Sequence, residues 1–121
     1  MIKKNIFFVF LITAGAAYGQ WEETPDSLYM VTYTTGKAWD HTKSPGEQLF
    51  FKSHSGHLSA LRKSGVITAG ARYSDKGMII IRSQSLPDAK NIIESDSAVS
   101  HHLFNVSVDK LSVFYPGCLE R

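Results

Sequence analysis

The sequence predicts an α+β domain in which strands and helices follow one another in the order β-α-β-β-α-β. Three observations carry this prediction: four segments rich in β-branched and aromatic residues, two segments with apolar residues at helical spacing, and glycine or proline at their junctions. A chain of 121 residues is expected to form a single domain. Because the connections in this order are short and right-handed, we expect a ferredoxin-like fold, with a four-stranded antiparallel sheet and two helices on one face.

Residues 1–19 have the pattern of a signal peptide. Two lysines precede an apolar run over 6–17, and Ala17 and Gly19 are the small residues expected at a cleavage site. The run is shorter than the ~18 apolar residues of a membrane span. We therefore expect cleavage before Gln20 and export, to the periplasm or the medium, without stable membrane insertion. A retained amphiphilic anchor is the alternative.

Charge and cysteine content exclude several classes of function. The chain has 13 basic and 11 acidic residues, and two of the basic residues lie in the expected signal, so the mature chain is formally neutral. No basic stripe is left to neutralise phosphates, and we do not expect nucleic-acid binding. Cys118 is the single cysteine, which excludes an internal disulfide. Metal-binding motifs such as CxxC and HExxH are absent from the sequence, and we expect neither a metal nor a cofactor.

The first half of the domain is expected to contain a strand, a loop and a helix. Residues 20–27 are polar and include a proline, which predicts a flexible leader. Residues 28–34 are β-branched and aromatic and predict the first strand. Glycine and proline within 35–46 predict a loop. Residues 47–64 predict the first helix, and Gly65 is a natural residue to end it.

The second half is expected to contain a hairpin and a second helix. Residues 66–73 and 78–83 predict the second and third strands, joined by a turn over 74–77. Ser85 is expected to begin the second helix, because an acidic residue follows three positions later and a proline lies in the first turn. This helix is expected to run to about Asp96.

The last strand closes the sheet and leaves one face of it uncovered. Residues 103–115 predict the fourth strand, so the domain spans 28–116 and residues 117–121 form a C-terminal tail. The first and third strands carry apolar residues on both faces, which is typical of strands buried on both sides. Since no further element is left to cover the second face, we expect a homodimer packed through the sheets.

Two polar residues are expected on the inner faces of the two helices. At 100° per residue His54 falls between Leu58 and Leu61 on the apolar face of the first helix. Asp96 follows Ala89 at seven-residue spacing on the apolar face of the second. Both faces are expected to look at the same sheet, so the two side chains are predicted to meet there.

A contact between this histidine and this aspartate would satisfy two groups that are costly to bury alone. Such a pair fixes the imidazole tautomer and raises its basicity, which is how a general base is built. Three alternatives stay open: a polar link without chemistry, an Asp96 that merely ends the second helix, and a metal site formed by His54, His57 and Asp96. The last is the weakest from spacing alone.

Other side chains are candidates for contact with a small ligand. Trp39, Tyr33 and Tyr73 could line an aromatic pocket, although core or interface packing is the commoner role for such residues. Arg72 could hold an anionic group, or lie solvated at a strand edge. His57 could add a polar contact, and a position at the rim of the helix is the alternative that we favour.

Taken in order, these features resemble the YCII-related (YciI-like) family, and the resemblance covers most of residues 28–116. The features that carry it are, in chain order, Gly36, Trp39, His54, Leu58, Leu61, Gly65, Ala69, Gly70, Asp75, Gly77, Asp96, Phe114 and Tyr115. The resemblance implies a dimeric α+β barrel with a pocket between helices and sheet. It also implies that His54, eleven residues before Gly65, and Asp96 form a catalytic pair, and it brings Gly70 into the set of ligand-binding candidates.

This chain departs from that family at two turns and at its start. Asp96 is followed by Ser97 where the family has an Asp-Pro step, and Ala71 stands where the family's Ala-Gly-Pro turn has its proline. The expected export signal is a third departure.

Two hypotheses of function arise from the residues and from the resemblance. The first is a small cofactor-free enzyme of isomerase or lyase type, which uses a His–Asp pair for proton transfer on a small organic acid or aromatic compound. The second is a noncatalytic homodimer that binds a small ligand or has a structural role. Related folds act on small aromatic or lactone-like molecules as isomerases, dehalogenases or cofactor-free oxygenases, which is analogy by fold alone.

Overall fold

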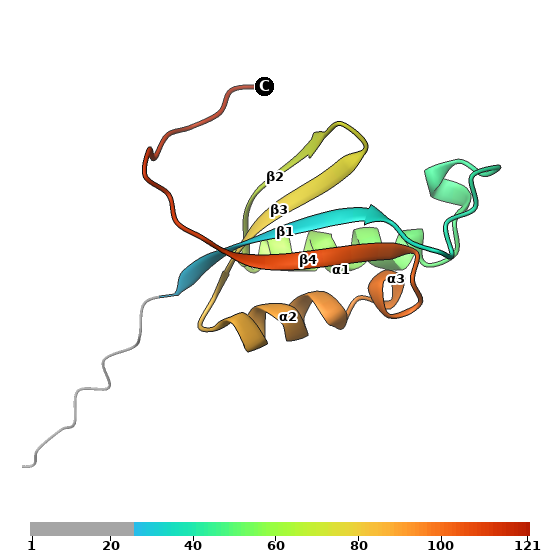
Figure 1. Cartoon of the computed structure of the whole chain (residues 1–121), viewed down its shortest axis with the longest axis horizontal. Helices are drawn as coiled ribbons and strands as arrows, with labels where there is room; N and C mark the ends of the chain where they lie inside the picture. The colour runs from blue at the N-terminus through green and yellow to red at the C-terminus, as the bar shows by residue number, and fades with distance from the viewer. Residues whose placement is uncertain (1–25) are drawn as a thin grey trace, which may run out of the picture.

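The computed structural model describes residues 26–121 and shows one four-stranded antiparallel sheet (Figure 1). Its strands are β1 (Ser27–Thr35), β2 (Ile67–Tyr73), β3 (Lys76–Ser83) and β4 (Phe104–Leu111). They lie in the order β2-β3-β1-β4, so the first strand is central and pairs with both β3 and β4. The predicted α+β class and the four-stranded antiparallel sheet are confirmed, and the arrangement is compatible with a ferredoxin-like fold.

Helices α1 (Phe51–Lys63) and α2 (Leu86–Glu94) pack on the same face of this sheet (Figure 1). Strand alternation explains why, since every second residue of the central strands points to that face. The core consists of buried side chains from the sheet and from α2: Tyr29, Val31, Tyr33, Ile67, Ile79, Ile81, Ala89 and Ile93. Leu58 and Leu61 of α1 are partly buried and pack against it. Burial of these apolar side chains holds both helices on the sheet.

The first helix begins later than its periodicity predicts. Residues Pro45–Glu47 form a separate 3-10 turn, η1, with its own capping box between Ser44 and Glu47. Phe50 then adopts a left-handed backbone conformation with φ 68°, which a continuous helix cannot contain. The expectation of one helix over 47–64 was wrong at its start for this reason.

The end of the first helix agrees with the prediction. Gly65 has φ 79°, and its N–H donates to Arg62 O while the N–H of Val66 donates to Leu61 O. These two hydrogen bonds are those of a Schellman motif, which favours glycine at its left-handed position.

The second helix ends before Asp96. Its start is as predicted, because the Ser85 side chain accepts a hydrogen bond from Asp88 N–H at 3.2 Å. A short further helix, α3 (Ser97–Ser100), follows, and Asp96 is its N-cap residue. The expectation that α2 runs to about Asp96, and the alternative that Asp96 merely ends it, were therefore wrong.

Two strand boundaries also differ from expectation. The hairpin turn contains only Ser74 and Asp75, because β3 begins at Lys76. Strand β4 stops at Leu111, which pairs with Leu28 near the start of β1. Beyond this point β1 offers almost no partner residues, so residues 112–121 have no regular structure and the strand does not reach 115.

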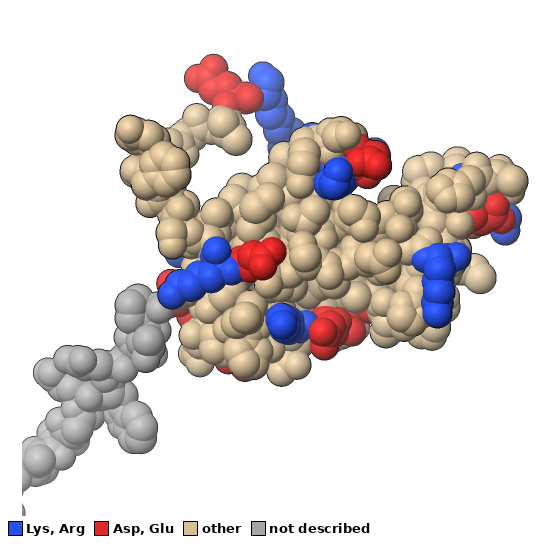
Figure 2. Space-filling model, viewed as in Figure 1, with Lys and Arg blue, Asp and Glu red and all other residues tan. Residues whose placement is uncertain are grey.

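The sheet face opposite the helices is not covered by any element of residues 26–121. Leu28, Met30 and Ile80 lie on this face and are half-buried. Figure 2 shows acidic and basic side chains interspersed over the visible face, with broad areas free of charge.

Two expectations concern the N-terminus. The expected signal over 1–19, and nearly all of the expected leader over 20–27, lie outside the described residues. Within 26–121, no helix is long and apolar enough to cross a membrane.

Candidate active site

His54 on α1 and Asp96 at the start of α3 meet beneath the sheet. The imidazole Nδ1 and the carboxylate Oδ2 are 2.5 Å apart, and the two residues are 8% and 1% exposed. The contact predicted from the helical spacing is therefore present. It differs from expectation in one respect, since the carboxylate is supplied by the N-cap of a separate short helix.

The position of Asp96 favours its charged form. Burial raises the pKa of this carboxyl. The hydrogen bond from His54, the bond from Ala98 N–H at 2.9 Å, and the charges of His54 and His57 together outweigh burial, so the pKa lies below its ordinary value. Since an ionised carboxylate only accepts hydrogen bonds, the proton in the short contact belongs to His54 Nδ1.

The other ring nitrogen of His54 is thereby left as an acceptor in the neutral imidazole. Within residues 26–121, Nε2 makes no hydrogen bond, and Tyr33 Oη is the one fully buried side-chain polar atom without a partner. His54 Nε2 therefore retains some solvent exposure. His54 is one of the residues that line a cavity of about 550 Å³.

Three aromatic rings surround the imidazole. The centroids of Phe104, Tyr33 and Phe51 lie 4.7, 5.4 and 6.1 Å from that of His54, and the Tyr33 contact is edge-to-face. Trp39 extends this group, with its ring 5.7 Å from Phe104. The imidazole is thus held by packing as well as by its hydrogen bond, which fixes the direction of Nε2.

Tyr33 is buried beside the His54–Asp96 pair. Its hydroxyl lacks a hydrogen-bond partner within 26–121. Burial, and secondarily the negative charge of Asp96, raise the pKa of Tyr33 well above its ordinary value. The phenol therefore stays neutral beside the pair.

Two glycines leave the floor of the cavity bare. Gly77 pairs with Tyr33 on one side and with Arg72 on the other, so all three lie on the cavity face of the sheet. Gly70 pairs with Ile79 on the same face. Both glycines line the cavity, and a Cβ on Gly77 would make only an ordinary contact with Tyr33 Cβ at 3.9 Å.

Of the four predicted ligand-binding residues, three line this cavity: Trp39, Gly70 and Arg72. His57 does not, because its Nε2 donates a hydrogen bond to Ile92 O at 3.0 Å and links α1 to α2. The structure thus places His57 at the contact between α1 and α2, which neither the ligand-binding expectation nor the rim alternative had described. Tyr73, suggested for an aromatic pocket, points elsewhere: it is 44% exposed, and Lys76 Nζ lies 5.9 Å from its ring centroid.

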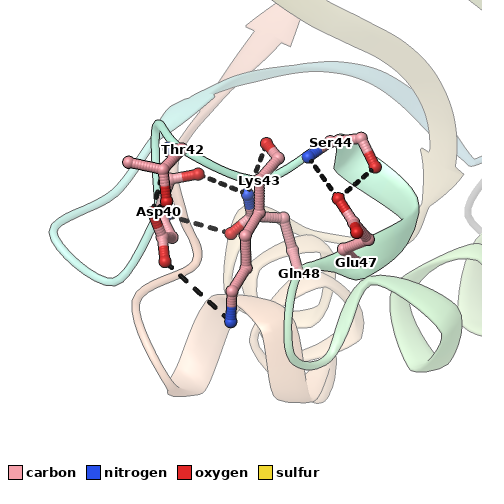
Figure 3. A network of polar contacts seen from close by, with 6 residues as sticks. All are labelled: Asp40, Thr42, Lys43, Ser44, Glu47 and Gln48. Carbon is pink, nitrogen blue, oxygen red and sulfur yellow. Dashed lines mark hydrogen bonds and ion pairs between the residues drawn. The ribbon is translucent and has the colours of Figure 1, made fainter.

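Gln48, which the sequence did not single out, organises the loop that carries Trp39 (Figure 3). Its side chain is buried and accepts from Asp40 N–H at 3.0 Å, while its amide donates to Asp40 O at 2.6 Å and Lys43 O at 3.2 Å. These bonds close the loop between β1 and η1, which lies beyond the end of β1 in Figure 1. Trp39 on this loop and Pro45 at the start of η1 line the cavity.

The same loop is fixed at its start by Gly36. Its N–H donates to Leu103 O at 2.8 Å, and a Cβ at this position would lie only 2.1 Å from His102 O. A residue with a side chain could not approach that backbone so closely, so this position requires glycine.

A metal site is not assembled from the described residues. Within 26–121, no group of three or more His, Cys, Asp or Glu side chains is placed to hold an ion. His57 is engaged with Ile92 O, so the alternative set of His54, His57 and Asp96 does not converge.

A comparison with protein-family models gives no match to this chain, and a comparison with curated proteins gives none either. A function for this chain therefore has to rest on the geometry of His54, Asp96 and the cavity beside them.

Proposed function

We propose that this protein is a small enzyme that transfers protons with His54 as general base and Asp96 as the residue that orients it. One observation carries the proposal: Nδ1 of His54 is bonded to a buried carboxylate, while the ring borders a cavity of about 550 Å³. A base needs an available lone pair next to the substrate, and this arrangement provides one.

The chemistry that fits is isomerisation or elimination that begins at an acidic C–H bond. His54 Nε2 takes the proton, and the resulting imidazolium is stabilised by Asp96 through the existing hydrogen bond. Returning the proton to another carbon gives isomerisation, and loss of a leaving group gives elimination. Neither step needs an oxidant or a reductant.

We also propose membership of the YCII-related (YciI-like) family. Support comes from the contact between His54 and Asp96. It also comes from two positions that require glycine, Gly36 because of its close approach to the His102 backbone and Gly65 because of its positive φ. In this proposal the sheet is one half of a dimeric α+β barrel, and the chain is exported after cleavage of residues 1–19.

A second copy of this chain is the proposed cover for the outer face of the sheet. Leu28, Met30 and Ile80 form an apolar centre on this face, opposite both helices. Sedimentation at micromolar concentration should show a dimer, and Met30→Lys should dissociate it while the exposed control Asn91→Lys should not. A wild-type monomer would contradict this proposal.

The alternative function is a noncatalytic binding or structural homodimer. The observation in its favour is that the His54–Asp96 contact links α1 to α3 and would stabilise their packing without any chemistry.

Deuterium exchange separates these two functions. A panel of small ring acids and lactones with acidic C–H bonds is incubated with the protein in D₂O, and loss of the C–H signal is followed by proton NMR. We expect wild type and the control His57→Gln to exchange at least one compound, and His54→Gln to lose that exchange. If no compound exchanges, or if His54→Gln exchanges it equally, the enzyme proposal is wrong.

A further inference from the structure

We propose that Arg72 is the anion-binding residue of this cavity, and that the ligand is a small unsaturated ring compound bearing one carboxylate. The inference rests on the proposed function of the site and adds to it a substrate class and a residue that selects for it.

The strand register places Arg72 two strands away from Tyr33, whose ring contacts His54. Arg72, Gly77 and Tyr33 face one another across three strands, and all point to the cavity side of the sheet. Since neighbouring strands are 4.7–4.9 Å apart, Arg72 and Tyr33 are about 10 Å apart at the backbone. Gly77 has no side chain, so the path from Arg72 to the rings around His54 is open. One ring with a carboxylate can extend along it.

The charges of the cavity lining favour a single anion. Besides Arg72, the lining contains Lys76 and Asp75, which pair with each other at 3.3 Å. Within residues 26–121, the Arg72 guanidinium makes neither an ion pair nor a hydrogen bond. Among the described residues that line the cavity, the exposed Arg72 is therefore the one cation of an arginine or lysine without a paired acid. A carboxylate matches it in charge and in fork geometry, whereas a phosphate dianion would leave a charge unmatched near Asp75.

The walls favour a flat, unsaturated ligand. Trp39 and Phe104 lie 5.7 Å apart, and both line the cavity with Phe51 and His54. Rings of this kind prefer offset or edge contacts with a second ring. A ring resting on them, with its carboxylate on Arg72, would present its carbon atoms to His54 Nε2.

The test compares benzoate with its neutral analogue benzamide, by titration into the ¹⁵N-labelled protein. We expect benzoate to shift the Trp39 indole signal and the backbone signals of the β2–β3 hairpin. Arg72→Gln should weaken benzoate binding about tenfold and leave the weaker binding of benzamide unchanged. Arg82→Gln is the matched control, because Arg82 is an exposed arginine on β3 that does not line this cavity.

Several outcomes would overturn the inference: equal binding of benzoate and benzamide, equal benzoate binding by wild type and Arg72→Gln, or an equal loss in Arg82→Gln. Inorganic phosphate that competes better than benzoate would also overturn it. Because these are binding measurements, they are independent of deuterium exchange. A protein that binds benzoate through Arg72 but exchanges no C–H bond would retain this assignment of Arg72 and refute the enzyme proposal.

Discussion

The imidazole of His54 and the carboxylate of Asp96 are joined by a 2.5 Å hydrogen bond across 42 positions of sequence. The carboxylate is held on its other oxygen by the N–H of Ala98, so one side chain both caps α3 and orients the histidine. Because of this dual role, substitution of Asp96 should affect both the stability of the fold and the orientation of His54, and the two effects can be measured separately.

Removing the Asp96 charge should destabilise the protein in a pH-dependent way. Its folded pKa lies below the unfolded value, so the unfolded chain binds more protons and the carboxylate contributes stability above the unfolded pKa. This contribution is lost as the pH falls through the folded pKa. We expect Asp96→Asn to cost about 3 kcal/mol at neutral pH, and less in acid. Urea unfolding at several pH values measures this.

The control for that variant is Glu94→Gln, because Glu94 is exposed at the end of α2, away from the outer face of the sheet. It should change the free energy of unfolding by less than about 0.5 kcal/mol. A cost of Asp96→Asn that stays constant down to strongly acidic pH would contradict the account of its charge.

Tyr33→Phe should not destabilise the fold. The hydroxyl is buried without a partner among the described residues, so its removal loses no hydrogen bond and relieves a desolvation cost. We expect the free energy of unfolding to stay equal or to rise by about 1 kcal/mol. Ultraviolet titration should also show that Tyr33 does not ionise with the other tyrosines, because its pKa is raised. Loss of a normally titrating tyrosine in Tyr33→Phe would refute this.

Gly77→Ala should fill part of the cavity without unfolding the protein. The added methyl would make ordinary contact with Tyr33 Cβ at 3.9 Å. It would also lie in the path between Arg72 and the aromatic rings. We expect weaker benzoate binding with an unchanged fold, measured by NMR titration.

Gly56→Ala is a suitable comparison for that variant. Gly56 lies in α1 with open space around its Cβ position, so alanine there should stabilise the helix by about 1 kcal/mol and leave binding unchanged. Equal benzoate binding by wild type and Gly77→Ala would show that the ligand does not occupy this space.

Gln48→Ala should loosen the loop that carries Trp39. Three hydrogen bonds are lost, and part-buried backbone groups of the loop, the N–H and C=O of Asp40 and the C=O of Lys43, lose their partner. We expect a cost of about 2–3 kcal/mol and broadening of the Trp39 indole signal. The exposed Gln84→Ala should change neither, and a sharp, unshifted Trp39 signal in Gln48→Ala would contradict this role.

The sequence allowed the elements and the central contact to be predicted because both depend on local periodicity. Alternation placed Tyr33 and Val31 on one face of a strand, and helical spacing placed His54 among leucines. The start of α1 was missed because Phe50 adopts a left-handed backbone conformation, which the conformational preferences of phenylalanine do not predict.

The remaining parts of the site depend on long-range pairing. Phe104 reaches His54 because β4 pairs with β1 in a register that places Phe104 opposite Thr35. Gln48 acts through hydrogen bonds to loop backbone, which no spacing predicts. Asp96 was placed correctly on the inner face but was assigned to the wrong helix, because a cap and a helix end differ by only a few residues in sequence.

The tautomer of His54 tests the central claim most directly. Long-range ¹H–¹⁵N correlation spectra, recorded where the ring is neutral, distinguish a protonated ring nitrogen from one with a lone pair. We expect His54 to carry its proton on Nδ1 and to have a bare Nε2, and we expect Asp96→Asn to abolish this preference. A proton on Nε2 in the wild-type protein would contradict His54 as a general base oriented by Asp96.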